Sequence, residues 1–297
     1  MASTIQAKLT DSRGDLSNGG RAQRWWLGKS PKRSGKYQMD GTMQVVDQFA
    51  IIKQYSLKGF EYGNWVNNND RNDRLSATAE SLNDLATIIG TENIGFDGML
   101  GIAFGARGVP GALAHFEPHT YMINLTREKG FGSLAHEYGH ALDYFFGTYI
   151  DQNRDYASLV GGRTTQTDLE FPNGGDFRKL ANKIINSVIF EKKGVKSATY
   201  KAWEEKAKPG GYWFRRNEIF ARVFEQWVRA KLKTWNIRNT FLSKEKYERV
   251  VYVKPADFAR IEPMMDKLIA NFGRTLSGKK KPVKQTVHKP MKRAARK

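Results

Sequence analysis

Cysteine is absent from the 297-residue sequence, and histidine occurs only five times. The lack of cysteine excludes disulfide bonds, thiolate nucleophiles, iron–sulfur clusters and zinc sites held by thiolates. Imidazole and carboxylate groups are the other side chains that commonly bind transition metals in proteins. Any metal ion held by this chain must therefore be bound by histidine, aspartate or glutamate.

Long apolar segments are also lacking. No run approaches the ~18 apolar residues of a membrane-spanning helix, and the polar N-terminus contains no apolar core of a signal peptide. The composition still includes 40% hydrophobic residues, which is enough for a sizeable core in a chain of this length. We therefore expect a soluble, intracellular protein that is not secreted by a signal peptide and has no membrane partner.

Acidic residues are few relative to basic ones, with 30 Asp and Glu against 49 Lys and Arg, for a net charge of +19. Such an excess attracts nucleic acid, phosphate-rich surfaces or acidic partners. Residues 279–297 contain nine basic side chains and no acidic one. A segment of this kind can also be a solubilising extension. The candidates for nucleic-acid contacts are Lys279, Lys280, Lys281, Lys292 and Arg293.

The chain divides into three regions by composition. Residues 1–40 are basic, rich in Gly and Ser and without hydrophobic periodicity, which is typical of a flexible N-terminal arm. Residues 41–275 contain apolar segments that alternate with turn signals, so we expect them to form one folded domain. Residues 276–297 combine prolines with many basic residues, which indicates a disordered basic tail.

The predicted helices and strands indicate an α+β fold. Apolar residues at helical spacing predict a helix over residues 78–89, which ends at Gly90. Three short extended segments follow, and we expect the last of them to be an edge strand. These strands are 99–104, 112–116 and 120–125. The remaining predicted elements are helices at 134–146, 177–190, 197–206 and 213–233, a strand at 250–253 and a helix from Pro263. A small sheet followed by a mostly helical C-terminal half is an α+β arrangement.

The strongest motif lies in the predicted helix at 134–146. His136, Glu137 and His140 form an H-E-x-x-H sequence, which on a helix places the two imidazoles one turn apart on the same face. Two such histidines and a third protein ligand bind one catalytic zinc ion per chain, with the fourth position left to water. A zinc ion lowers the pKa of the water bound to it to about 7. We expect Glu137, which lies beside the two histidines, to be the general base that takes the proton of this water. Two surface histidines on a helix remain the alternative.

The third ligand is less well defined by the sequence. A ligand six residues after His140 is excluded, because Phe146 occupies that position. Glu218 begins a strongly periodic helical segment, and a glutamate from a later helix completes one common class of zinc site. Its alternative role is to complement the helix dipole. The other candidate ligands are Asp143, Asp151 and Glu225, although Asp143 is better placed to orient a metal-bound histidine.

Four further residues are candidates for contacts with a substrate or an oxyanion. His115, His119 and Tyr121 lie shortly before the motif, and Tyr212 follows a Pro-Gly-Gly sequence close to Glu218. Tyr212 and the adjacent Trp213 could form an aromatic wall beside the metal. Packing in the core or on the surface is an equally reasonable interpretation of each of these residues.

Five stretches of the sequence together carry a family resemblance. They are FEYGNWV (60–66), LGIAFGARG (100–108), ALAHFEPHTYMINLT (112–126), GSLAHEYGHALD (132–143) and NEIFARVFEQWV (217–228). In this order they resemble the metallopeptidase-like domain associated with large polyvalent proteins of phages and conjugative elements. The resemblance implies a zincin-like fold, a phage or mobile-element origin, and a location in the host cytoplasm or the virion. It also implies zinc at His136 and His140 with Glu137 catalytic, and Glu218 falls in the stretch taken to complete the site.

Two functional hypotheses follow from the sequence. The first is a zinc metallopeptidase that cleaves a peptide or protein substrate, with an extended peptide paired to the predicted edge strand at 120–125. The second is a basic, nucleic-acid-associated protein, packaged or injected with phage DNA, in which the zincin scaffold is structural. The two hypotheses are compatible, because basic termini could deliver a protease to DNA-bound targets.

Overall fold

The computed structural model of the chain describes residues 33–34, 47–64, 68–106, 113–126, 130–150, 156, 158, 175–244, 246–247 and 249–277. Most of the predicted N-terminal arm and nearly all of the predicted tail lie outside these residues. The same holds for Asp151 and for the basic candidates Lys279, Lys280, Lys281, Lys292 and Arg293.

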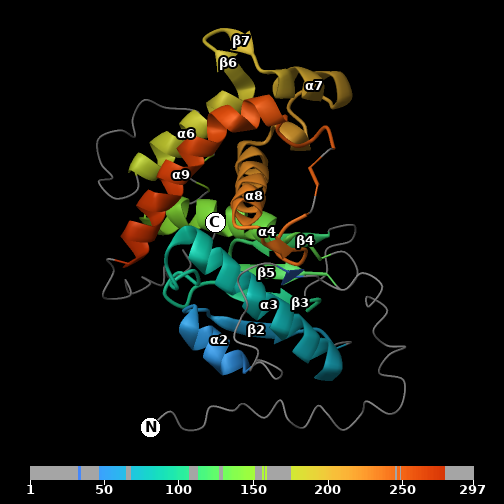
Figure 1. Ribbon diagram of the computed structural model, residues 1–297, viewed down its shortest axis with the longest axis vertical. Helices are drawn as coiled ribbons and strands as arrows, with labels where there is room; N and C mark the ends of the chain where they lie inside the picture. The colour runs from blue at the N-terminus through green and yellow to red at the C-terminus, as the bar shows by residue number, and fades with distance from the viewer. Residues whose placement is uncertain are drawn as a thin grey trace, which may run out of the picture.

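A four-stranded mixed sheet forms one layer of the molecule (Figure 1). Its strands are β2 (Gly59–Tyr62), β3 (Gly101–Phe104), β5 (Met122–Leu125) and β4 (Ala114–Glu117), in that order across the sheet. The first three run parallel, with Ile102 opposite Ile123, and β4 runs antiparallel to β5. The three strands predicted before the motif helix are therefore confirmed.

The expectation that residues 120–125 form the edge strand was wrong. This strand, β5, is paired on both sides, and the edge is β4. The physical reason lies in burial: all four residues of β5 are buried, whereas three of the four in β4 are half-buried. The chain forms the antiparallel edge first and then turns back, with Tyr121 at a φ of 53°, into the interior of the sheet.

Helices make up most of the remaining structure. The two helices at the N-terminal end are α2 (Gln48–Gln54) and α3 (Asn68–Ile89). The motif helix α4 (Leu134–Phe145) continues as a π-helical turn, η3 (Phe146–Ile150). The C-terminal helices are α6 (Gly175–Ile189), α7 (Ala198–Lys206), the 3-10 turn η5 (Tyr212–Phe214), α8 (Arg216–Thr234) and α9 (Pro255–Ser277). Short strand pairs join β1 (Arg33–Ser34) to β8 (Arg238–Asn239) and β6 (Phe190–Lys192) to β7 (Val195–Lys196).

The α+β expectation, with a small sheet followed by a mostly helical half, is confirmed. The predicted strand at 250–253 was wrong, and the last helix begins earlier than predicted. Residues 250–253 form turns, because the apolar side chains there cover a cavity instead of joining a sheet. The last helix begins at Pro255, which suits the first turn of a helix because its missing N–H has no intrahelical acceptor there, and Pro263 lies inside it.

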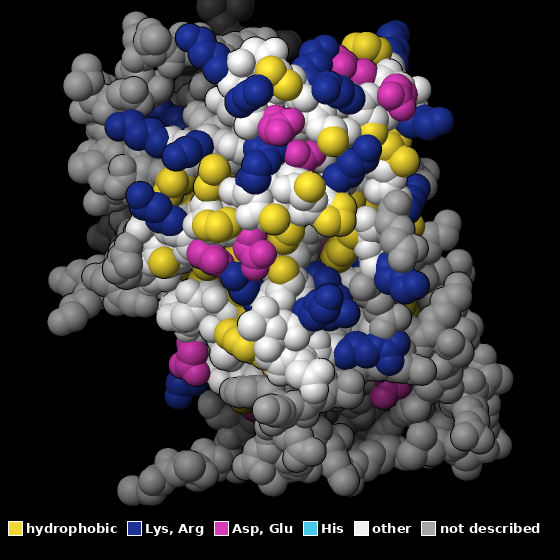
Figure 2. Space-filling model, turned by 45° about the horizontal axis from the view of Figure 1, so that its top comes forward, with side chains coloured by type: hydrophobic (Ala, Val, Ile, Leu, Met, Phe, Trp, Pro, Cys, Tyr) yellow, Lys and Arg dark blue, Asp and Glu magenta, His cyan; other side chains and the backbone are white. Residues whose placement is uncertain are grey.

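One face of the described surface is rich in basic side chains. On the face shown in Figure 2, lysine and arginine side chains are spread over the surface and predominate over aspartate and glutamate. Among the helices that the structure describes, none is both long and apolar enough to cross a membrane. The positive charge of the sequence is therefore not confined to its two ends.

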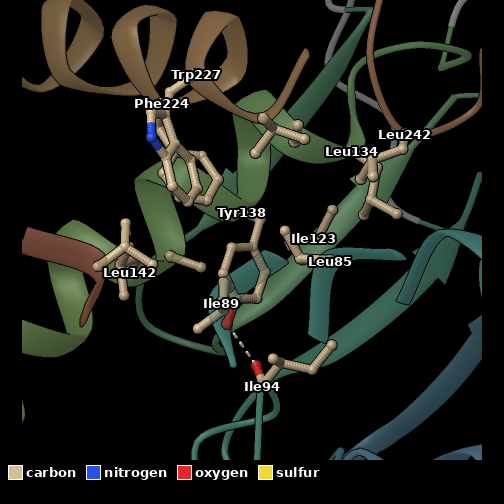
Figure 3. Close-up of a cluster of buried hydrophobic side chains, with 14 of the residues drawn as sticks. Leu85, Ile89, Ile94, Ile123, Leu134, Tyr138, Leu142, Phe224, Trp227 and Leu242 are labelled. Atoms are coloured by element: carbon tan, nitrogen blue, oxygen red, sulfur yellow. Dashed lines mark hydrogen bonds between the residues drawn. The ribbon is translucent and has the colours of Figure 1, made fainter. Parts of the chain in front are cut away.

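The core under the motif helix is formed by side chains from the sheet, α3, α4 and α8. Tyr138 lies at its centre, with its hydroxyl donating to the carbonyl of Ile94 at 2.9 Å (Figure 3). Its ring packs on Phe224 of α8, with ring centroids 5.9 Å apart. Next to it, a Cβ at Gly139 would lie only 3.1 Å from the Cα of Ala221. The glycine therefore lets the backbones of α4 and α8 approach closely.

Candidate metal centre

The motif helix presents two histidines on one face. His136 and His140 lie one turn apart on α4, with ring centroids 4.9 Å apart and an interplanar angle of 82°. The first turn of this helix is held by the loop before Lys244, since the Ala135 amide donates to the carbonyl of Leu242 at 2.9 Å. Ser133 occupies the N-cap position but makes no side-chain capping bond. The direction of the helix therefore depends on a tertiary contact.

Glu218, in the first turn of α8, faces both imidazoles. Its Oε1 lies 3.4 Å from His140 Nε2, and its Oε2 lies 3.6 Å from His136 Nε2. One donor atom from each of the three residues lies within 4.8 Å of the other two. The close packing of α4 on α8 at Gly139 brings these groups together across about 80 residues of sequence. The structure thus assembles a group that could hold a metal ion.

The three side chains fit a divalent cation. Glu218 Oε2 is buried and has no hydrogen-bond partner, although a buried carboxylate oxygen without one is costly. Two imidazole nitrogens and a carboxylate oxygen are the donor set of many catalytic zinc sites. Burial opposes ionisation of Glu218, but its contacts with His136 and His140 outweigh this effect and hold its pKa well below the usual range. Glu218 is therefore a carboxylate that a cation would satisfy.

His136 lies between two carboxylates. Its Nε2 faces Glu218, and its Nδ1 lies 3.2 Å from Oε2 of Glu225, a side chain that is fully buried. Burial lowers the pKa of His136, but the hydrogen bonds and charges of these two glutamates outweigh it and raise the pKa to about 10. Without a metal ion, a proton on His136 therefore neutralises part of the negative charge at the centre.

Glu225 orients His136 and is itself held by a lysine. Its Oε1 accepts a hydrogen bond from Lys244 Nζ at 2.7 Å, and the charges of His136 and Lys244 keep its pKa low despite its burial. A hydrogen bond from Nδ1–H to Glu225 leaves Nε2 available as a ligand. In the sequence Glu225 was only an alternative ligand, although its position seven residues after Glu218 places it two turns on along the same face.

Asp143 was expected to orient a metal-bound histidine, but its carboxylate forms hydrogen bonds with Ser158. Its Oδ1 and Oδ2 accept hydrogen bonds from the backbone amide and the hydroxyl of Ser158, at 2.8 and 2.5 Å. His140 Nδ1 is buried and has no hydrogen-bond partner among the described residues. The carboxylate placed against a histidine Nδ1 is therefore that of Glu225 and not that of Asp143, which instead ties α4 to the segment at Ser158.

Glu137 lies at the wall of a cavity of about 660 Å³, next to the candidate ligand His136, which lines the same cavity. The side chain is buried and acts electrostatically on His136. Tyr212 and Trp213 line the same cavity. Burial and the negative charge of Glu218 raise the pKa of Tyr212, so its hydroxyl stays protonated and can donate a hydrogen bond.

The other three candidates for substrate contacts lie away from the cavity wall. His115 is on β4 opposite Asn124, and His119 is in the turn between β4 and β5. The Tyr121 hydroxyl forms a 2.5 Å hydrogen bond with Thr148, and its ring packs on Phe116. Among the described residues that line the cavity, none of these three is present. The structure thus brings Tyr212, but not His115, His119 or Tyr121, to the candidate centre.

One comparison with known proteins gave a match. Residues 204–276 match the family described as large polyvalent protein-associated domain 1. No curated protein and no solved structure matches the chain. The matched segment contains α8 with Glu218 and Glu225, the loop with Lys244, and all of α9 except its last residue. The two histidines come from the residues before it.

Proposed function

We propose that the chain is a zinc-dependent metallopeptidase with a zincin-like catalytic centre. The observation that carries this proposal is the convergence of His136, His140 and Glu218, whose donor atoms lie within 4.8 Å of one another. Glu137, the acid of the H-E-x-x-H motif, lies beside them at the wall of a cavity large enough for a peptide side chain and its backbone. A purely structural site would not need an acid in that position.

His136, His140 and Glu218 would hold the ion, and Glu225 would keep His136 in the correct tautomer. A bound zinc ion supplies a Lewis acid for the scissile carbonyl and acidifies water to a pKa of about 7. Glu137 takes the proton of the attacking water and passes it to the leaving amine. Tyr212 lines the same cavity with a protonated hydroxyl, which makes it a candidate donor to the oxygen on which negative charge develops.

The substrate is proposed to pair with β4. This strand is the edge of the sheet, and its first residue, Ala114, lines the cavity next to Glu137. An extended peptide can add to such an edge through main-chain hydrogen bonds, which depend little on side-chain identity. We therefore assign to β4 the substrate-pairing role that the sequence alone gave to residues 120–125.

A phage or mobile-element origin is part of the same proposal. It is supported by the match of residues 204–276 to a domain associated with large polyvalent proteins, and by the resemblance of the motif segments to the metallopeptidase-like domain of such proteins. The enzyme would act in the host cytoplasm or the virion on a phage or host protein.

Metal content and proteolysis together test the proposal. We expect about one zinc ion per chain by elemental mass spectrometry, and none in the His136→Ala/His140→Ala double variant. Glu137→Gln should keep the zinc and abolish cleavage of a fluorogenic peptide pool. Absence of zinc from the wild-type protein, even after dialysis against zinc, would contradict the metal site. Cleavage by Glu137→Gln at the wild-type rate would contradict the catalytic role of Glu137.

A second candidate function is binding to nucleic acid. The net charge of +19 and the basic surface in Figure 2 favour it. Lysine and arginine contacts with phosphate release counterions and give binding that is independent of sequence and weakens with salt. This function is compatible with a protease whose basic surface keeps it near DNA-bound substrates.

A further inference from the structure

The cavity at the candidate metal centre has a basic lining. Lys206, Arg222, Lys244 and Arg249 contribute to its wall, and among the described lining residues the only acid is Glu137. These cations come from separate parts of the chain: the end of α7, the second turn of α8 and the loop before α9. The fold therefore gathers positive charge at this cavity.

Arg222 is the most firmly held of the four. It is 3% exposed and lies one helical turn after Glu218, on the same face of α8. Its Nη2 donates to the carbonyl of Trp213 at 2.5 Å, and its guanidinium lies 5.2 Å from the ring centroid of Trp203. Its Nε is buried without a hydrogen-bond partner. Arg222 is thus held rigidly in the cavity wall, and a guanidinium in such a position is suited to bind an oxyanion.

The other lining cations differ in what they can offer a ligand. Lys244 is neutralised by its 2.7 Å ion pair with Glu225. Lys206 and Arg249 are exposed at the mouth of the cavity. Apolar side chains from Leu113, Trp213, Val250 and Val251 also contribute to this wall. The cavity thus combines an apolar surface with a buried guanidinium and two further cations at the entrance.

We propose that the cavity binds a carboxylate of the substrate, held by Arg222 with Lys206 and Arg249 at the entrance. This inference rests on the proposed peptidase function and specifies its substrate class. The carboxylate can come from an acidic side chain next to the scissile bond or from the C-terminus of a peptide. Both sources present the same planar pair of oxygens to the guanidinium. An acidic peptide also suits the basic side chains of the cavity wall and the net charge of +19.

Binding of fluorescein-labelled octapeptides by the zinc-loaded protein tests this proposal. The first peptide contains four Glu and four apolar residues with an amidated C-terminus, the second replaces Glu by Gln, and the third is the Gln peptide with a free C-terminus. All measurements use the Glu137→Gln background, so that cleavage does not interfere. We expect at least one carboxylate peptide to bind about tenfold more tightly than the Gln amide. Preference for the first peptide identifies an acidic side chain, and preference for the third identifies the C-terminus.

Variants of the cationic wall identify where the carboxylate binds. Lys206→Gln/Arg249→Gln should reduce the preference to about threefold or less, and Arg222→Gln should abolish it while Arg222→Lys restores part of it. The matched control is Lys192→Gln/Lys193→Gln, which removes two charges from the exposed β6–β7 hairpin outside the cavity wall. The control should leave the preference unchanged. If substitution of the buried Arg222 prevents folding, the peptide preference of the Lys206→Gln/Arg249→Gln protein still tests the proposal, because both of these side chains are exposed.

The possible outcomes separate this inference from the proposed function. Equal binding of all three peptides, or equal losses in the cavity and control variants, would overturn the carboxylate site. A short single-stranded oligonucleotide provides a further check. If it binds more tightly than the peptide and displaces it, and does so only when Lys206 and Arg249 are intact, the cavity is a phosphate site and the carboxylate proposal is overturned. Selective peptide binding without any hydrolysis by the wild-type protein would support the carboxylate site and contradict the peptidase function.

Discussion

His136 connects the candidate metal centre to the buried glutamates. Its two ring nitrogens face the carboxylates of Glu218 and Glu225, and both carboxylates are buried. A proton and a metal ion compete for Nε2, because only the neutral imidazole binds a metal. The protonation of this one residue therefore links metal affinity to pH.

We predict that zinc affinity rises with pH. The pKa of His136 is raised from about 6.5 in the unfolded chain to about 10 in the folded protein. The proton on His136 therefore stabilises the metal-free fold, fully below pH 6.5, and this stabilisation is lost as the pH rises through 10. Zinc must displace that proton throughout this range. Affinity should increase about tenfold per pH unit between pH 7 and 8.5, with release of about one proton. Calorimetry in buffers of different ionisation enthalpy measures both quantities, and a pH-independent affinity would contradict the prediction.

A second prediction at this scale concerns Glu225. Glu225→Gln removes the charge that orients His136 and leaves Lys244 without its ion-pair partner. We expect zinc affinity to fall by about 10- to 100-fold. The matched control is Glu262→Gln, which breaks a 3.1 Å Lys–Glu pair with Lys231 away from the centre. Competition with a chromophoric chelator measures both variants, and equal effects would show that Glu225 has no specific role.

At the scale of elements, the packing of α4 on α8 assembles the centre. α4 contributes the two histidines and Glu137, and α8 contributes Glu218 and Glu225. Gly139 and Ala221 lie where the two helices touch, and small residues there allow close approach of the two backbones. The distance between the helices therefore sets the distance between the metal donors.

Gly139→Ala tests this dependence. Alanine stabilises a helix by about 1 kcal/mol relative to glycine. At position 139, however, its Cβ would lie 3.1 Å from Ala221 Cα and 3.3 Å from Phe224 Cβ. The helices must separate by a few tenths of an ångström, and we expect a net loss of about 1–3 kcal/mol in unfolding free energy. Zinc affinity should fall with it, since Glu218 moves with α8. Urea denaturation with and without zinc measures both effects; unchanged stability and affinity would contradict this account.

At the scale of the whole molecule, positive charge is present both on the described surface and in the terminal sequence. Lysines and arginines are spread over the face in Figure 2, and residues 279–297 add nine more basic side chains. Long-range attraction of this kind raises association rates with any polyanion and weakens with salt. The proposed metal centre and electrostatic attraction to polyanions can therefore be tested separately.

We predict that deletion of residues 279–297 weakens binding to duplex DNA and leaves zinc content unchanged. The dependence of log affinity on log salt should become shallower by about 0.9 for each phosphate that the basic side chains of the tail neutralise. Fluorescence anisotropy at several salt concentrations, beside elemental analysis, measures both properties. Unaltered DNA affinity in the deletion variant would contradict a role for the tail, and a fall in zinc content would contradict its independence from the metal centre.

Much of the site and the fold class could be predicted from the sequence because the signals are local. His136 and His140 are four residues apart, and helical periodicity alone places them on one face. The α+β class and most helices followed from periodicity and glycine positions. Residues 250–253 show where this fails, because an extended apolar pattern covers a cavity wall as readily as it joins a sheet.

The sequence by itself determined the chemistry of this protein: an imidazole pair with an adjacent carboxylate, no thiolates, and a large positive charge. Only the tertiary structure decided which distant groups complete that chemistry. Glu218 and Glu225, not Asp143, meet the histidines; β4, not β5, is the edge strand; and Arg222 faces the cavity. The reason is physical: spacing along one helix is set by local geometry, whereas the approach of one element to another depends on how their side chains pack.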